Sequence, residues 1–369
     1  MRFTFLVHPL TEMQLRILGA RSLSLDILGA RLGSLERVAF DPAFTHPITH
    51  FPQIVSATGA TCTGQIVGLP TLPGPMLNDQ VQAVAMMADA VARFGQGADL
   101  VGLGAICAIV GLRGQELASR LSTPVTTGNS LTCWTAVETT ALLLDRLGAS
   151  RHFNPRVLVV GLPGTMALGV LTIMARRGMP VEAFHPTFPR ALARKLDQIE
   201  AECGRPLPRH TDLDAALKGK GIVVGAGSVG GELAEADLRS GTVVVDVARP
   251  LDTSVAQRRR DDLLIVEGEM ISLPAATGQG WNSFWSRLYN LVVGQVDERV
   301  FACLAEPMVL CLEGRPESFS LGRDIDPEKV EVIGALAARH GFGIRELFRG
   351  REPLHDTLLR EFIDIPWLP

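Results

Sequence analysis

The feature that most constrains the fold is an uncharged stretch from Val157 to Ala175. Its length could suggest a membrane span, but glycines and a proline interrupt it between residues 161 and 164. The residues before the interruption, 157–160, are β-branched, as in a buried parallel strand, and residues 165–177 predict a helix. A second predicted strand at 181–185 completes a βαβ unit, so we expect a parallel sheet with a right-handed crossover.

The same alternation continues along the chain. It predicts helices over 190–203 and 211–217 and strands over 221–224, 242–247 and 263–266. Repeated strand and helix pairs build a doubly wound sheet, so residues 151–295 are predicted to form a Rossmann-type dinucleotide-binding domain.

The flanking regions complete the predicted α/β architecture. Residues 1–150 are predicted as an N-terminal α/β substrate domain, and residues 296–369 as a C-terminal helical segment that carries the candidate nucleophile. Within these regions the hydrophobic spacing predicts helices over 78–94, 130–147, 297–313 and 327–340 and a strand over 100–103.

Two glycine-rich turns compete for the role of phosphate-binding loop. Gly225-Ala-Gly-Ser-Val-Gly230 matches G-x-G-x-x-G, but a short acidic stretch follows it and leaves little room for the helix that must hold a pyrophosphate. The turn that begins at Gly161 opens a full helix, whose first amides would point at phosphate oxygens. The predicted cofactor-binding residues are therefore Gly161, Gly164, Thr165, Met166 and Ala167, with Gly225 at the neighbouring strand end.

The end of the second strand indicates which dinucleotide is bound. NAD sites place a carboxylate there, whereas this chain has Glu182 inside the strand and Arg190, Arg194 and Lys195 beyond it. Arginines accommodate a 2′-phosphate, so NADPH is the predicted cofactor and Arg190 its contact. An ordinary solvated helix face is the alternative interpretation of these basic residues.

Scarce residue types exclude several mechanisms. The only tyrosine, Tyr289, is followed four residues later by Val293, so the Tyr-x-x-x-Lys pair of short-chain dehydrogenases is absent. Lys195 is the first lysine in the chain, which excludes an enzyme with a lysine base in its N-terminal domain. The net charge of −4 argues against a general nucleic-acid binder.

The six cysteines show no metal or disulfide pattern. No pair forms C-x-x-C and no histidine stands at zinc-ligand spacing, so no metal site is predicted. There is no charged and then apolar leader, so we expect a cytoplasmic protein with reduced thiols and no transmembrane segment. From composition alone Cys303 and Cys311 are small hydrophobic residues of an apolar helix.

Several motifs occur in a fixed order over roughly residues 50–342. They are Ser56-Ala-Thr-Gly59, Thr126-Thr-Gly-Asn129, the Gly161 turn, Asp246, Phe301-Ala-Cys-Leu-Ala-Glu306, Glu313-Gly314, Phe319-Ser320, Gly322-Arg323 and Arg339-His-Gly-Phe342, with His8 as a weaker match. In this order they resemble the long-chain acyl-[acyl-carrier-protein] reductases best known from cyanobacteria.

This resemblance implies a mechanism and its residues. Cys303 would carry the acyl group of a thioester, and NADPH would reduce the acyl-enzyme to a fatty aldehyde. Asn129 is the candidate donor to the oxyanion, and His340 is the candidate for moving the proton. The implied partners are an acyl carrier protein or a CoA thioester as substrate and a downstream enzyme that uses the aldehyde.

Arginines offer a docking surface for an acidic carrier protein. They are Arg258, Arg259, Arg260, Arg339, Arg345, Arg349 and Arg351. For residues 258–260 a solvated turn is favoured, because Asp261 and Asp262 follow immediately. Two other functions remain open: an NADP-dependent dehydrogenase of the shikimate or amino-acid type, and a non-catalytic nucleotide-binding partner protein.

Overall fold

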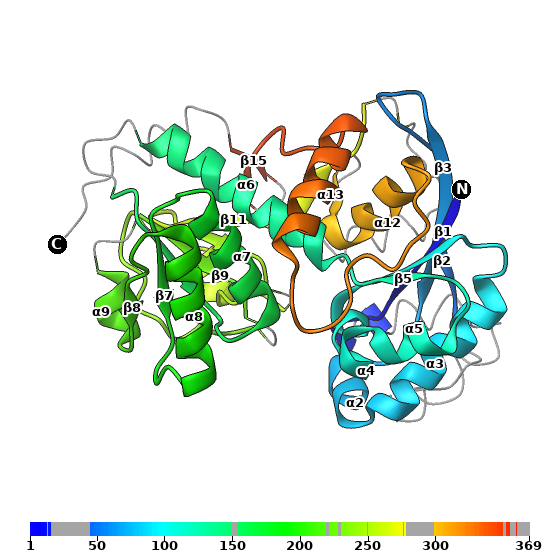
Figure 1. Cartoon of the computed structure of the whole chain (residues 1–369), viewed down its shortest axis with the longest axis horizontal. Coiled ribbons are helices and arrows are strands. Elements are labelled where there is room, and N and C mark those ends of the chain that lie inside the picture. The colour runs from blue at the N-terminus through cyan, green and yellow to red at the C-terminus, as the bar shows by residue number, and fades with distance from the viewer. Residues whose placement is uncertain are drawn as a thin grey trace. The chain divides into compact units, whose positions relative to one another are not determined.

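The chain divides into two compact units. The computed structural model describes residues 1–12, 14–15, 45–148, 154–218, 221–227, 230–248, 250–275, 277, 299–349, 352–354 and 359. Unit 1 comprises Met1–Leu131, Ile271–Arg323 and Val332–Gly343. Unit 2 comprises Thr132–Met270, Asp324–Glu331 and Ile344–Pro369. Figure 1 shows the helices and strands of both units.

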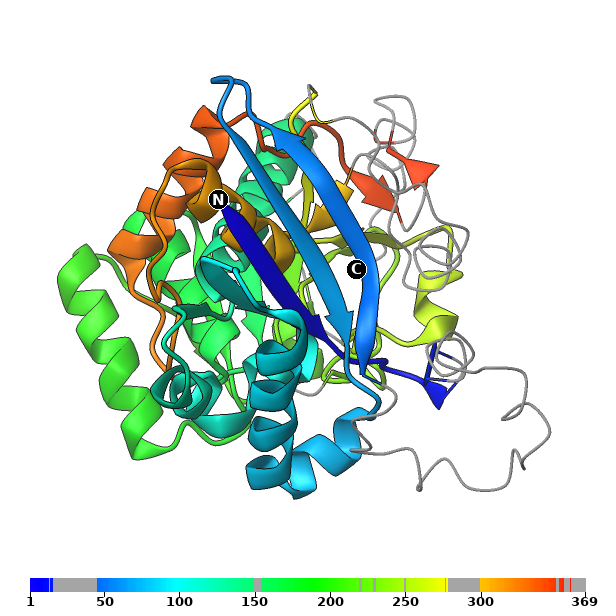
Figure 2. The ribbon, with the colours of Figure 1, turned by 90° about the vertical axis from the view of Figure 1, so that its right-hand side faces the viewer.

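Unit 1 is built on a five-stranded sheet in the order β2-β3-β1-β4-β5. Its strands are β1 (Arg2–Val7), β2 (His46–Val55), β3 (Thr61–Gly68), β4 (Leu100–Leu103) and β5 (Val125–Thr126). All neighbours are parallel except β2, which runs antiparallel to β3 at the edge. Figure 2 shows β1, β3 and β2 side by side. The parallel strands bring their carboxyl ends to one edge of the sheet, and the loops that follow them meet there.

The helices of unit 1 cover both faces of this sheet, because alternate residues of a strand point to opposite sides. Leu6, Val101 and Leu103 form one core with the helix α3 (Gln80–Phe94). The intervening Gly102 faces the helix α12 (Ala302–Leu312), where a Cβ on the glycine would lie 2.8 Å from the Pro307 ring. The remaining helices of the unit are α2 (Pro73–Asn78), η3 (Ala105–Ala108), α4 (Val110–Arg113) and α5 (Gln115–Arg120).

Unit 2 contains a six-stranded parallel sheet in the order β11-β10-β9-β6-β7-β8. Its strands are β6 (Val157–Val160), β7 (Val181–Phe184), β8 (Arg209–His210), β9 (Ile222–Gly225), β10 (Val243–Asp246) and β11 (Leu264–Glu267). In chain order this is the 3-2-1-4-5-6 arrangement of a doubly wound sheet, and the order reverses between β6 and β9. The predicted parallel α/β sheet is therefore confirmed.

Two apolar cores cover the faces of the unit 2 sheet. Val157, Val159 and their neighbours pack with α6 (Asn129–Leu147), α7 (Thr165–Arg176) and α8 (Arg190–Cys203). Leu158 and Val160 point to the other face and pack with α9 (Leu213–Leu217). The unit also holds the short helix α10 (Val255–Arg258) and the strand pair β14 (Phe348–Arg349) and β15 (Glu352–Pro353).

The C-terminal region differs from the predicted division at residues 150 and 295. Helix α12 belongs to the core of unit 1, where Cys62 Sγ lies 3.8 Å from the carbonyl oxygen of Met308. The division between the units falls inside α6 and inside α13 (Pro327–Arg339). The predicted helix over 297–313 begins at residue 302, because residues 299–301 form strand β13 (Arg299–Phe301), which pairs with β12 (Met270–Ser272).

Candidate functional site

Cys303 is the second residue of α12, directly after the strand β13. Phe301 occupies the N-cap position in an extended conformation and provides no side-chain cap. The thiol is half-buried, as is Cys203 in unit 2, whereas Cys62, Cys107, Cys133 and Cys311 are buried. Burial raises the pKa of each of these four thiols, that of Cys311 to about 12, so they are poor nucleophiles.

The turn between β5 and α6 lies directly on Cys303. A Cβ on Gly128 would stand 2.3 Å from Cys303 Cα and 2.6 Å from its Cβ, and Gly128 has a φ of +75°. Only glycine fits such an approach in this backbone conformation. The contact brings Asn129, the first residue of α6, next to the thiol position. The Asn129 side chain is half-buried and makes no hydrogen bond with any residue in the described part of the chain.

A buried carboxylate, Glu306, holds this turn in place one helical turn beyond Cys303. The side chain is fully buried and accepts hydrogen bonds from Thr126 Oγ1 and, at 2.9 Å, from the Leu131 amide. Gly128 and Ser320 donate to it as well. Burial raises the pKa of Glu306, and the four donors act against that shift.

Ser320 completes the connection between α6 and the segment after α12. Its Oγ accepts from the Ser130 amide at 3.1 Å and lies 2.7 Å from Ser130 Oγ. Its carbonyl oxygen accepts from the amide and the hydroxyl of Thr127 at 2.9 and 3.0 Å. Glu306 and Ser320 were part of the motif series, but the sequence assigned them no role, because their donors lie about 180 positions away in the chain.

His340 lies at the other end of α12 from Cys303. Its Nδ1 is 2.8 Å from Ser56 Oγ, and its Nε2 is 2.9 Å from Glu313 Oε2. Glu313 follows the last residue of α12, ten positions after Cys303, which is about 15 Å along a helix axis. The structure therefore places Asn129 beside Cys303 but does not place His340 there.

His8 is a buried histidine at the carboxyl end of β1. Its Nδ1 lies 2.8 Å from the Pro9 carbonyl oxygen, and its Nε2 accepts from the Ile106 amide at 3.0 Å. Burial lowers the pKa of His8 to about 4, so the ring is neutral and serves as a structural link between two loops.

In unit 2 the two glycine turns meet where the strand order reverses. A Cβ on Gly161, whose φ is +104°, would stand 2.6 Å from the Gly227 nitrogen and 2.8 Å from the Ala226 carbonyl oxygen. This is the position between β6 and β9 at which doubly wound sheets bind their ligands.

The literal G-x-G-x-x-G motif is explained by packing against residues 250–252. A Cβ on Gly227 would lie 2.6 Å from Asp252 Oδ1, and one on Gly230 would lie 2.2 Å from the Pro250 carbonyl oxygen. Asp252 accepts from the amides of Gly227 at 2.8 Å and Glu232 at 3.2 Å, so the Gly227 amide already has a partner. Burial raises the pKa of Asp252 to about 6.

The first turn of α7 offers the arrangement that the sequence predicted for phosphates. Gly164 is its N-cap without a side-chain cap, the first turn holds no acidic residue, and Ala167 is fully buried. Arg190, the first residue of α8, is exposed and makes no hydrogen bond or ion pair with any described residue. Asp246 turns inward, where its carboxylate accepts from the amides of Ala248, Asp252 and Thr253 and from the Thr253 hydroxyl.

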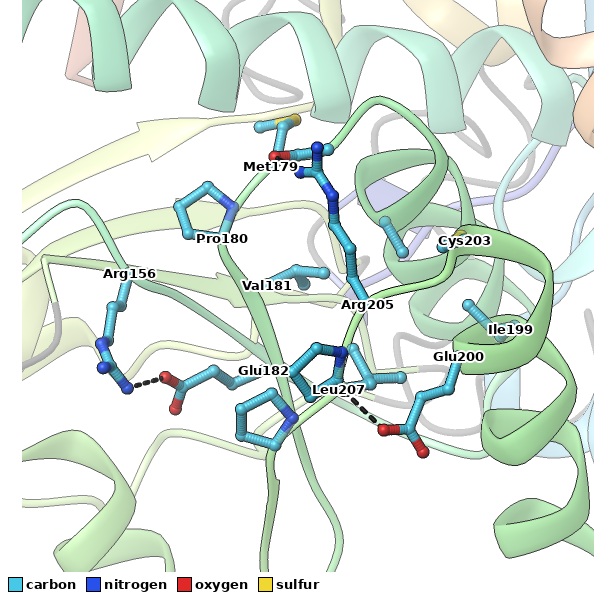
Figure 3. Close-up of a pocket in the computed structure, with 14 residues that line it drawn as sticks. Arg156, Met179, Pro180, Val181, Glu182, Ile199, Glu200, Cys203, Arg205 and Leu207 are labelled. Atoms are coloured by element: carbon cyan, nitrogen blue, oxygen red, sulfur yellow. Dashed lines mark hydrogen bonds and ion pairs between the residues drawn. The ribbon is translucent and has the colours of Figure 1, made fainter.

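A cavity of about 360 Å³ lies at the opposite, amino ends of β6, β7 and β8 (Figure 3). At its rim Arg156 Nη1 donates to Glu182 Oε1 at 2.7 Å, and Glu200 Oε1 accepts from the Leu207 amide at 2.7 Å. Cys203 lines its wall. None of the predicted cofactor-binding residues lies here.

Several predicted surface arginines are engaged within their own unit. Arg260 forms a two-bond ion pair with Asp262 at 2.6 and 2.9 Å, and Arg258 donates to the Thr253 carbonyl. Arg339 pairs with Glu313 at 2.9 Å and Arg349 with Asp261 at 3.4 Å. Arg351 lies outside the described residues, as does Tyr289.

The described residues contain neither a candidate metal cluster nor a candidate membrane-spanning helix. No group of three or more histidine, cysteine, aspartate or glutamate side chains among them could hold a metal ion. None of their helices is both long enough and apolar enough to cross a membrane.

Comparisons with known proteins give a partial match. No family model matches the chain. The aminotransferase PigE of Serratia sp. (strain ATCC 39006) is 32% identical over 298 residues, which are 80% of this chain and 34% of that protein. The long-chain acyl-[acyl-carrier-protein] reductase of Synechococcus elongatus (strain ATCC 33912 / PCC 7942 / FACHB-805) is 28% identical over 151 residues, 40% of this chain and 42% of that protein. The chain thus spans about a third to two fifths of these relatives.

Solved structures are more distant. An N-acetyl-L-ornithine transcarbamylase has a TM-score of 0.30 at 19% identity, with 61% of this chain and 65% of that chain covered. The A chain of dipicolinate synthase from Bacillus subtilis has a TM-score of 0.32 at 13% identity, with 79% and 94% covered.

These comparisons contradict the family predicted from the motifs. The match to the aminotransferase covers 80% of the chain, twice the share that matches the reductase. The predicted acyl-[acyl-carrier-protein] reductase activity, the oxidoreductase class and the NADPH cofactor are therefore wrong. The structure gives a physical reason why such motifs mislead: Gly128, Glu306 and Ser320 are required by packing around one turn, whatever chemistry is done there.

Proposed function

We propose that unit 1 carries out covalent chemistry through the thiolate of Cys303. The observation that carries this proposal is the position of Cys303 at the second residue of α12, half-buried and without a side-chain cap on the helix. The start of a helix bears partial positive charge and unpaired amide groups, which stabilise a thiolate.

The proposed step is addition to an electrophilic carbonyl carbon. The sulfur electron pair forms the S–C bond, the π electrons of the carbonyl move to its oxygen, and that oxygen takes up a proton from water. Asn129 is the proposed hydrogen-bond donor to this oxygen, because it follows Gly128, which lies against Cys303, and its half-buried side chain has no partner among the described residues. His340 is not included, because its ring nitrogens bond to Ser56 and Glu313 at the other end of α12.

Alkylation with iodoacetamide tests this proposal, with Cys203 of the same protein as the reference thiol. Cys203 is also half-buried but is the last residue of α8, where the helix end disfavours negative charge. Peptide mass spectrometry after short exposures from pH 5 to pH 9 gives both rates. We expect Cys303 to react at least about tenfold faster than Cys203 below pH 7. Equal rates at the two thiols across this range would contradict the proposal.

A second proposed function is nucleotide binding by unit 2. It rests on the reversal of strand order between β6 and β9, where Gly161 lies against the Ala226–Gly227 turn and α7 begins. We propose that the phosphates of a nucleotide bind at Gly164, Thr165 and Met166, with Ala167 allowing close helix packing. Arg190 and Gly225 are the further proposed contacts.

Calorimetric titration with ADP tests this second proposal. Gly164→Asp places a carboxylate at the N-cap of α7, which caps the helix well but repels phosphate. Gly164→Asn caps the helix without the charge and is the matched control. We expect Gly164→Asp to weaken ADP binding at least about tenfold relative to Gly164→Asn. Absence of ADP binding to the unmodified chain, or equal binding by both variants, would refute it.

The activity named for the aminotransferase relative is not carried over to this chain. Enzymes that use pyridoxal phosphate hold it through a lysine Schiff base. The described lysines are Lys195, Lys218 and Lys329, none of them is buried, and Lys195 pairs with Asp324 at 3.6 Å. These residues do not fit that cofactor.

A further inference from the structure

A strained turn in unit 1 presents an arginine to solvent. Gly111, Leu112, Arg113 and Gly114 all have positive φ values, between +52° and +80°. Left-handed backbone is unfavourable for non-glycine residues, so Leu112 and Arg113 are held there by their surroundings. The turn is fixed by hydrogen bonds from the Gly111 amide to Gln80 Oε1 at 3.2 Å and from the Gly322 amide to the Arg113 carbonyl at 3.1 Å.

The Arg113 guanidinium is half-buried and forms no hydrogen bond or ion pair with any residue that the structure describes. Another cation, Arg323, directly follows Gly322, whose amide donates to the Arg113 carbonyl. Burial and the charge of Arg323 both lower the pKa of Arg113. Two cations brought together in this way repel one another, and an anion bound between them would remove that repulsion.

The backbone next to Arg113 packs against the segments that lead to Gly128 and to Arg323. A Cβ on Gly114 would stand 3.2 Å from Thr127 Cγ2 and 3.0 Å from Leu321 Cδ2. Thr127 precedes Gly128, whose contact with Cys303 is described above. The left-handed turn, the turn before α6 and the segment that ends at Arg323 therefore lie next to one another at the carboxyl edge of the unit 1 sheet.

We propose that Arg113 and Arg323 bind the anionic group of the molecule that reacts at Cys303. This inference rests on the proposed nucleophilic role of Cys303 and defines the substrate class: a carbonyl compound that carries a carboxylate or phosphate group. Guanidinium groups bind both anions in a planar, two-bond geometry. Leu112, which is 51% exposed on the same turn, contacts an apolar part of that molecule.

The test compares two alkylating reagents of nearly equal size, anionic iodoacetate and neutral iodoacetamide. In both reactions the thiolate forms an S–C bond, and the C–I bond breaks to release iodide. The measured quantity is the iodoacetate to iodoacetamide rate ratio at Cys303, divided by the same ratio at Cys203. In low salt we expect a value of at least about 3, because two nearby cations attract the anionic reagent. Salt at 1 M should bring it close to 1.

Variants show which residues cause the preference of Cys303 for iodoacetate over iodoacetamide. Arg113→Gln and Arg323→Gln should each reduce the normalised ratio by at least about half. Arg120→Gln removes the same charge from an exposed arginine of unit 1 that has no partner among the described residues, and should leave the ratio unchanged. A ratio of 1 in the unmodified protein, or one that both Arg113→Gln and Arg323→Gln leave intact, would overturn the proposal.

A second measurement separates anion binding from thiol reactivity. In Cys303→Ser, which keeps both arginines, inorganic phosphate at ten times its dissociation constant should raise the unfolding temperature by about 2 °C relative to sodium chloride of equal ionic strength. Arg113→Gln in this background should abolish that increase. If iodoacetamide reacts no faster with Cys303 than with Cys203, only the proposed nucleophilic role of Cys303 is refuted. If phosphate does not raise the unfolding temperature of Cys303→Ser, only the proposed anion site is refuted.

Discussion

Unit 1 and unit 2 use the same arrangement at the carboxyl edge of a parallel sheet. In unit 1 Glu306 holds the turn at Gly128, and in unit 2 Asp252 holds the turn at Gly227. Both carboxylates are fully buried and accept backbone amides. The difference lies in what stands beside the turn: a thiol at the start of α12 in unit 1, and the bare start of α7 in unit 2. The same support therefore lies next to the proposed covalent site in unit 1 and next to the proposed anion site in unit 2.

The largest expected effect comes from adding a side chain at Gly128, where the backbone lies against Cys303. Gly128→Ala would push a methyl group into Cys303 Cα, at a residue that already has a positive φ. We expect unit 1 to lose about 4 kcal/mol of unfolding free energy in urea denaturation. Gly59→Ala is the control, because Gly59 also has a positive φ but no atom within 4 Å of the added Cβ, so it should lose only about 1 kcal/mol. Equal losses in the two variants would show that glycine is needed at position 128 only for its positive φ, and not for the close approach to Cys303.

A smaller effect is the pH dependence that Asp252 gives to the stability of unit 2. Since burial raises the pKa of Asp252 to about 6, folded unit 2 keeps a proton that the unfolded chain has already released. The free energy of unfolding should therefore fall as pH rises from about 4 to about 6, by about 2–3 kcal/mol from this group. Denaturation of Asp252→Asn over this range should lack that decrease. If Asp252→Asn shows the same pH profile as the unmodified protein, other groups cause the decrease in the free energy of unfolding.

The smallest expected effect is that of Glu306→Gln. Glutamine keeps the shape of the side chain but turns an NH₂ group toward a donor, which leaves one of the buried donors unpaired. Loss of a buried charge offsets part of that cost, so we expect unit 1 to be less stable by about 1 kcal/mol at pH 7. A variant as stable as the unmodified protein would indicate that Glu306 is protonated in the folded state.

Local pattern was a reliable guide to the elements of unit 2. The strand at 157–160 and the helix at 190–203 lie where hydrophobic spacing placed them. Spacing succeeds for these elements because the central strands are buried on both faces and the helices bury one side. It did not find β13, whose three residues run directly into α12, and it gave no sign of the left-handed turn at 111–114, which depends on Gly322 from far along the chain.

The structure brings together only some of the residues that the sequence placed in one site, for a similar reason. Asn129 and Cys303 come together because Gly128 allows the approach, whereas His340 is tied to Ser56 and Glu313 at the far end of α12. The literal glycine motif was predicted to be a structural loop rather than the phosphate site, and its glycines make room for Pro250 and Asp252. A motif records which positions need glycine, and not which neighbour requires it.

The sequence by itself determined that the central region forms parallel strands with covering helices, because buried β-branched runs and amphipathic spacing are local properties. It also predicted an apolar helix that contains Cys303, although the predicted start at residue 297 lies five residues before the start of α12. Only the tertiary structure decided that Glu306 supports Gly128, that Gly161 lies against Gly227, and that Arg113 stands beside Arg323. Those contacts join positions from 66 to 210 residues apart, and their energies depend on distances and burial that no local pattern contains.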